Sequence, residues 1–236
     1  MLENRPGTGA PKHIGDFCEV LEELSLMKYL ALVGSRSYGL ELDGSDYDYF
    51  IVGNAAAPIP EKYCFRRTPQ EMLRQLLLRW EHPYALMPFF SPQIEADEKT
   101  KTLIIDSREW LVASFRKRLY TTYKSMAESF LQYDAAQSAY YAKMNAYGLL
   151  WLDTLARYAK GETFAAAHLP SESIKPFLQA IRVQSEIAIA QIPAVKQDLL
   201  SRAEDLFDFY DAEEDTPLIA KFEADFNSIL EDDAND

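Results

Sequence analysis

The chain has 236 residues, of which 48% are hydrophobic and 13% aromatic, so it can bury the core of one large domain or two small ones. The net charge of −13 argues against general DNA binding, but residues 204–236 hold 13 acids and one lysine, while the rest of the chain has 24 acids and 23 bases. We expect no membrane partner, because the apolar runs are short and no signal-peptide pattern is present. We expect a cytoplasmic protein, because the two cysteines, Cys18 and Cys64, have neither metal nor disulfide spacing.

The first elements in chain order surround a glycine-rich turn. Residues 1–12 are rich in Gly, Pro and polar residues and are expected to form a loose arm, and the periodicity over 14–27 predicts an amphipathic helix. The apolar run 30–33 predicts a buried strand that stops at Gly34. Residues 46–52, with aromatic and β-branched side chains, predict a second strand.

Two carboxylates at the start of this second strand are the first sign of chemistry. Asp46 and Asp48 are two residues apart on the predicted strand, so alternation places them on the same face, where their like charges repel. A divalent cation would neutralise this repulsion, and Mg²⁺ prefers carboxylate and phosphate oxygens. Upstream, Gly34 and Ser35 offer backbone N–H groups and a hydroxyl, and Arg36 offers a guanidinium, which together suit a nucleoside triphosphate.

The full motif is Gly34-Ser35-Arg36-Ser37-Tyr38-Gly39 followed by Ser45-Asp46-Tyr47-Asp48. It resembles the signature of the DNA polymerase β-like nucleotidyltransferase superfamily, in its minimal and "predicted nucleotidyltransferase" branches. The resemblance implies an α+β fold, with an α/β-type core built on a small mixed sheet. It also implies that Asp46 and Asp48 are catalytic and hold Mg²⁺ or Mn²⁺, and that Gly34, Ser35, Arg36 and Ser45 bind an NTP such as ATP.

A third carboxylate is what the superfamily usually supplies from the strand after the Asp-x-Asp strand. Residues 61–66 predict that strand, and Glu61 is its only acid. Three alternatives remain open: Glu61 completes the site as a ligand or general base, the site has two acids, or the protein no longer catalyses.

The next segments are predicted as a helix over 69–80, a strand or extended connection at 103–105, and a helix over 107–126 with Ser107 as its cap. Residues 82–92 resemble a family segment that ends in Phe-Ser-Pro. The basic residues of the helix predicted over 107–126, among them Arg108, either contact phosphates or form a solvated face of that helix.

The rest of the chain is predicted to be helical, over 140–160, 171–190, 197–210 and 218–230, with an acidic disordered end at 231–236. Pro176 is expected near the start of the second of these helices, and Pro193 between the second and third. Lys143 matches the lysine that begins a helix of the resembled family, which implies contact with the nucleotide.

The predicted organisation is therefore an arm (1–12), a nucleotidyltransferase core (13–100), an all-helical C-terminal region (101–230) and the acidic end. The predicted function is transfer of a nucleoside monophosphate from an NTP to a hydroxyl of an RNA or tRNA end, a protein or a small molecule. One alternative is a catalytically inactive relative that binds or regulates. Another is an interaction protein of a toxin–antitoxin or phage–host system, whose acidic end binds a basic partner.

Overall fold

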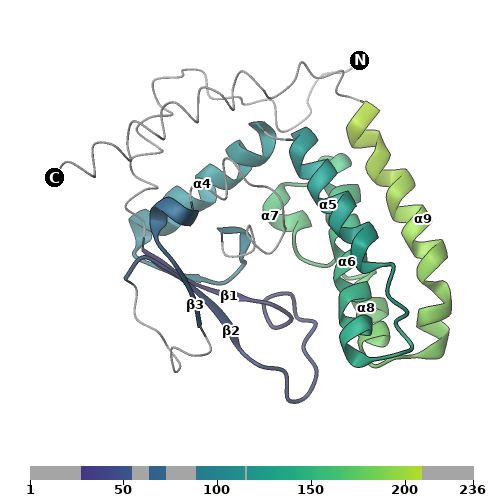
Figure 1. The fold of residues 1–236 in the computed structure, drawn as a ribbon. Helices are drawn as coiled ribbons and strands as arrows, with labels where there is room; N and C mark the ends of the chain where they lie inside the picture. Colours follow the sequence, from purple (N-terminus) through teal and green to yellow (C-terminus); the bar gives the residue numbers. More distant parts are fainter. Residues whose placement is uncertain (1–27, 55–63, 73–88, 115, 209–236) are drawn as a thin grey trace. The chain divides into compact units, whose positions relative to one another are not determined.

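The computed structural model of the chain describes residues 28–54, 64–72, 89–114 and 116–208 (Figure 1). These residues form a mixed α+β structure with one small four-stranded sheet and six helices. They fall into two compact units. The sheet unit comprises residues 28–34, 47–54, 64–72 and 89–114, and the helical unit comprises residues 35–46 and 116–208.

Several predicted segments lie outside the described residues. They are the arm 1–12, the helix 14–27, Glu61, residues 82–88, the helix 218–230 and the acidic end 231–236.

The sheet has the strand order β3-β2-β1-β4 (Figure 1). Its strands are β1 (Tyr29–Val33), β2 (Asp48–Val52), β3 (Cys64–Arg67) and β4 (Ile94–Glu95). β1 is antiparallel to both β2 and β4, whereas β3 runs parallel to β2. All five residues of β1 are buried, as the apolar run predicted.

The second strand is shorter than predicted, because it begins at Asp48 and leaves Asp46 outside the ladder. The last pair of the β1–β2 ladder joins Val33 to Asp48, and β1 then stops at Gly34 with a φ of +75°. No residue of β1 is left to pair with Asp46. The expectation that strand β2 begins at Asp46 and carries both carboxylates is therefore wrong.

A capping box at Thr68 and Glu71 begins the helix that follows β3. The Thr68 hydroxyl accepts a hydrogen bond from the Glu71 amide at 3.1 Å, and the Glu71 carboxylate accepts one from the Thr68 amide at 2.8 Å. The predicted helix over 69–80 thus begins at Pro69, and its first four residues are described.

A buried arginine fastens the Phe-Ser-Pro segment to the sheet. Arg108 is 8% exposed and donates from Nε to the Phe89 carbonyl and from Nη2 to the Ser91 carbonyl, both at 2.7 Å. The Ser91 hydroxyl donates to the Leu32 carbonyl of β1 at 2.6 Å. Arg108 is therefore part of the core of the sheet unit, and neither a phosphate contact nor a solvated face describes it.

The helix that carries Arg108 begins nine residues before the predicted start. It is α4 (Glu98–Ser114), and it includes residues 103–105, so the strand or extended connection predicted there is wrong. Asp97 caps it, because its carboxylate accepts from the Thr100 amide at 2.9 Å and from the Thr100 hydroxyl at 2.8 Å. Ile104 is fully buried while Ile105 is 56% exposed, as on a helix with one buried face.

The helical unit is built around α6 (Ala139–Ala159), in which every residue from Met144 to Ala156 is buried (Figure 1). The predicted helix over 140–160 is confirmed, with the Ser138 hydroxyl capping it by accepting from the Tyr141 amide. The other helices of this unit are α5 (Arg116–Phe130), α7 (Phe164–Ala167), α8 (Lys175–Arg182) and α9 (Glu186–Asp208). α5, α7, α8 and α9 all contact α6.

The predicted helix over 171–190 is two helices, since α8 ends at Arg182 and α9 begins at Glu186. Between them Gln184 has a φ of +57°, and its side-chain amide donates to the carbonyls of Ala135 and Ala136. Pro176 lies in the first turn of α8 as expected, but Pro193 is inside α9 and does not separate two helices. Buried side chains on either side of Pro193, Ile192 and Leu199, keep this helix packed in spite of the missing amide.

Candidate functional site

The boundary between the two units passes through the motif, between Gly34 and Ser35 and again between Asp46 and Tyr47. Gly34 and Asp48 belong to the sheet unit. Ser35, Arg36, Ser45, Asp46 and Lys143 belong to the helical unit. Glu61 lies outside the described residues.

In the sheet unit, Gly34 and the Asp48 carboxylate meet where β1 ends and β2 begins. A Cβ atom built on Gly34 would lie 2.6 Å from Asp48 Oδ2, well inside van der Waals contact. The φ of +75° is also in the left-handed region. The motif therefore needs glycine here for two reasons, and the carboxylate of Asp48 is held against the backbone at the end of β1.

We expect Gly34→Ala to lower the free energy of unfolding by about 2–3 kcal/mol, from the positive φ and the contact with Asp48 together. Gly44→Ala is the matched control, because Gly44 has a φ of +80° but nothing within 4 Å of a built Cβ. Urea unfolding of both variants measures the difference. Equal losses would show that the contact with Asp48 contributes nothing.

In the helical unit, the segment Ser35–Asp46, which we call the glycine loop, is closed by its own hydrogen bonds. The Ser35 carbonyl accepts from the amides of Tyr38 at 3.3 Å and Leu40 at 2.9 Å. The Arg36 guanidinium donates to the Ser45 carbonyl from Nη2 at 2.7 Å and to the Asp46 carbonyl from Nε at 3.2 Å. Arg36 thus ties the two ends of the loop together.

A second turn lies just before the acidic pair. The Leu42 amide donates to the Ser45 hydroxyl at 2.9 Å, and the Ser45 amide donates to the Leu42 carbonyl at 2.9 Å. Ser45 therefore shapes the backbone that leads into Asp46, whose side chain is exposed.

Tyr38 anchors the glycine loop to the helices. Its hydroxyl is 3.1 Å from His168 Nε2, and its ring meets the edge of Tyr147 with centroids 6.1 Å apart. The Gln179 side chain of α8 donates to the Gly39 carbonyl at 3.3 Å. Tyr38 and His168 are both buried, so the centre of the loop is part of the core of the helical unit.

Lys143 lies on the same side of α6 as this anchor. Its Nζ is 5.8 Å from the centroid of the Tyr147 ring, the ring that contacts Tyr38. The lysine predicted from the family motif and the glycine loop thus share one aromatic neighbour.

Among the residues that the structure describes, no group of three or more His, Cys, Asp or Glu side chains could hold a metal ion. Of the two carboxylates of the motif, Asp46 is exposed and Asp48 is half-buried. Strand β3, which pairs with β2, contains no acid between Cys64 and Arg67.

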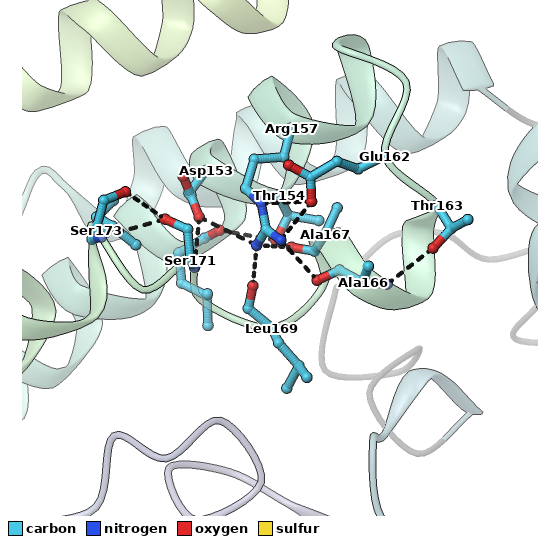
Figure 2. Close-up of polar contacts among 12 residues, drawn as sticks. Asp153, Thr154, Arg157, Glu162, Thr163, Ala166, Ala167, Leu169, Ser171 and Ser173 are labelled. Atoms are coloured by element: carbon cyan, nitrogen blue, oxygen red, sulfur yellow. Dashed lines mark hydrogen bonds and ion pairs between the residues drawn. The ribbon is translucent and has the colours of Figure 1, made fainter. Parts of the chain in front are cut away.

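A polar cluster on the far end of α6 was missed by the sequence reading (Figure 2). Arg157 donates to the carbonyls of Ala166 and Leu169 and pairs with Glu162. Asp153, 4% exposed, accepts from the Ser171 amide at 3.3 Å and lies 3.8 Å from Arg157. Burial raises the pKa of the Asp153 carboxyl above its ordinary value, because it disfavours the charged form.

The raised pKa of Asp153 predicts a pH-dependent loss of stability. The folded state holds this proton more tightly than the unfolded state, so stability falls as pH rises from the ordinary carboxyl pKa through the raised one. Asp153→Asn keeps an acceptor for Ser171, and we expect it to unfold no more easily than wild type at pH 7. Urea unfolding between about pH 4 and pH 7 tests this, with the exposed Asp198→Asn as control. The prediction would be contradicted if the free energy of unfolding of wild type exceeded that of Asp153→Asn by more at pH 7 than at pH 4.

None of the helices in the described part of the chain is long and apolar enough to span a membrane. Comparison with protein-family models, with curated proteins and with solved structures finds no match.

Proposed function

We propose that this protein is a Mg²⁺-dependent nucleotidyltransferase that moves a nucleoside monophosphate from an NTP to a hydroxyl acceptor. The proposal rests on the place where β1 ends and β2 begins, because Gly34 lies there against the carboxylate of Asp48. Asp46, the other acid of the pair, lies two residues before Asp48 in the chain. Neither carboxylate of this acidic pair forms an ion pair with another residue in the described part of the chain.

The acidic pair fits a divalent cation by its chemistry. Only Tyr47 separates Asp46 from Asp48, so the chain limits their α-carbons to a separation of about 7 Å in any conformation. Carboxylate oxygens are the ligands that Mg²⁺ prefers. Mg²⁺ bound there would neutralise charge on the triphosphate and lower the pKa of the attacking hydroxyl.

The residues of the chain would divide the remaining work. Gly34 and Ser35 would face the phosphates through backbone N–H groups, and Lys143 would stabilise the charge that develops on the leaving pyrophosphate. Arg36 would act by holding the backbone of Ser45 and Asp46, since its guanidinium bonds both carbonyls.

The transfer itself balances as a substitution at phosphorus. The acceptor oxygen bonds to the α-phosphorus, the bond from that phosphorus to the bridging oxygen breaks, and pyrophosphate leaves. The proton of the hydroxyl would pass to a carboxylate acting as general base, and the sequence offers Glu61 for this role.

The test is a labelling screen. The purified chain is incubated with each of the four α-labelled NTPs and Mg²⁺, with and without total tRNA or cell extract. The size of the labelled product identifies the acceptor class. Absence of label with every NTP and every acceptor pool would count against the proposal.

A catalytically inactive, nucleotide-binding relative is the second candidate. The observation that favours it is strand β3, whose residues Cys64 to Arg67 bring no acid beside β2. The wild-type chain separates the two candidates, because NTP binding without any transfer favours the inactive relative. Where the wild type does transfer, loss of transfer in Glu61→Gln assigns Glu61 to the site.

A further inference from the structure

The ammonium group of Lys175 lies against the glycine loop. Lys175 is the first residue of α8, and a Cβ built on Gly39 would be 2.8 Å from its Nζ and 3.2 Å from its Cε. Gly39 has a φ of +63° and carries no side chain, so the lysine reaches the backbone of the loop directly. The Ser35 carbonyl bonds the Leu40 amide at 2.9 Å, which places this contact next to the first residue of the loop.

The backbone of Lys175 is held in place by the cluster of Figure 2. Its amide donates to the Ser171 carbonyl at 2.9 Å, and the Ser171 amide donates to the Asp153 carboxylate. Arg157 of the same helix as Asp153 bonds the Leu169 carbonyl just upstream. The turn that leads into α8 is thus fixed to α6, which pre-organises Lys175.

The charge of Lys175 is not used within the described part of the chain. The ion pairs formed between described residues involve Lys101, Arg157 and Arg202, and none includes Lys175. Its side chain is half-buried, a setting in which a charge without an opposite charge is unfavourable. Lys143 is a second ammonium group near the loop, because its Nζ lies over the ring of Tyr147 and that ring contacts Tyr38.

We propose that Lys175 binds the β- and γ-phosphates of the NTP at the glycine loop. The inference rests on the proposed function and adds a phosphate ligand that the motif does not contain. A phosphate is the partner that fits, because Lys175 Nζ lies at the backbone of Gly39 without an ion pair among the described residues, and a lysine contacts phosphate as a point charge. The flexible stem of lysine lets the ammonium follow the phosphate without moving α8.

The test compares Lys175→Met with the control Lys160→Met. Lys160 is an exposed lysine at the end of α6, so its replacement removes the same charge from the same unit. Calorimetric titrations use Mg²⁺–tripolyphosphate, the NTPs and the matching NMPs. We expect Lys175→Met to weaken binding of tripolyphosphate and NTP by about ten- to a hundredfold, the size of a lost charge-assisted hydrogen bond. Binding of the NMP should change less than about twofold, and Lys175→Arg should restore most of the loss.

Each other outcome has a defined meaning. If wild type and Lys175→Met bind NTP equally well, this inference is overturned and the proposed function still stands. Equal weakening of NTP and NMP indicates a structural role and also overturns it, and thermal unfolding of both variants checks the fold. Unchanged NTP binding with a raised KM for a nucleic acid acceptor would place Lys175 on the acceptor. Wild type that binds no nucleotide overturns the proposed function together with this inference.

Discussion

Replacing both Asp46 and Asp48 by asparagine is expected to reduce nucleotidyl transfer by at least about a thousandfold, because the Mg²⁺ ligands proposed here contribute several kcal/mol of transition-state stabilisation. The fold should be retained, since neither carboxylate makes an ion pair with another described residue and their mutual repulsion is removed. The measurement is the rate of label transfer at saturating NTP, together with urea unfolding.

The matched control for the acidic pair is Asp43→Asn. Asp43 is an exposed acid of the same glycine loop, three residues before Asp46, and its replacement should leave the transfer rate within about twofold of wild type. Unchanged transfer in the double variant would remove Asp46 and Asp48 from the site. A loss of the same size in Asp43→Asn would point to general electrostatics of the loop.

Arg108→Met is expected to cause the largest loss of stability, about 3 kcal/mol. The change leaves the buried carbonyls of Phe89 and Ser91 without their donors, and each orphaned buried acceptor costs about 1–3 kcal/mol. Urea unfolding of the whole chain measures the loss.

Two variants control the Arg108 experiment. Arg108→Lys keeps the charge but loses the fork that reaches both carbonyls, so an intermediate loss is expected. Lys101→Met removes a partly exposed charge from the same helix and should cost less than about 1 kcal/mol. A loss for Arg108→Met no larger than that for Lys101→Met would contradict the structural role of the arginine.

The strands around the motif could be predicted because local signals agree there. An apolar run ends at a glycine, and an aromatic and β-branched run follows the acidic pair, so β1 and β2 were predicted to within two residues. What failed was the start of β2, since it depends on where β1 runs out of pairing residues, which the sequence of β2 alone does not contain.

Two errors in the predicted helices each have a physical cause. Residues 103–105 are apolar and two of them are β-branched, which favours a strand, but Asp97 caps a helix upstream and the burial of Ile104 stabilises that helix. The break between α8 and α9 is set by Gln184, whose side chain bonds carbonyls of the α5–α6 connection. The cap of α4 is a local signal that lies outside the apolar run, whereas the break at Gln184 depends on residues distant in the chain.

The candidate site shows the same division. Gly34, Ser35, Arg36, Asp46 and Asp48 were found from spacing, because they lie within one turn and its flanks. His168 and Lys175 were not, since their contacts with Tyr38 and Gly39 join residues far apart in the sequence and no spacing links them to the motif. A half-buried lysine at the first position of a helix gives no sequence signal of its own.

The most direct test of the central claim is the position of the phosphate that is transferred. The chain is given Mg²⁺, an acceptor pool and the same NTP labelled either at the α-phosphate or at the γ-phosphate. A nucleotidyltransferase places the α-label on the acceptor and releases the γ-label in pyrophosphate. The γ-label on the acceptor would show phosphoryl transfer, and release of the γ-label as inorganic phosphate without any labelled acceptor would show hydrolysis, and either result would contradict the account.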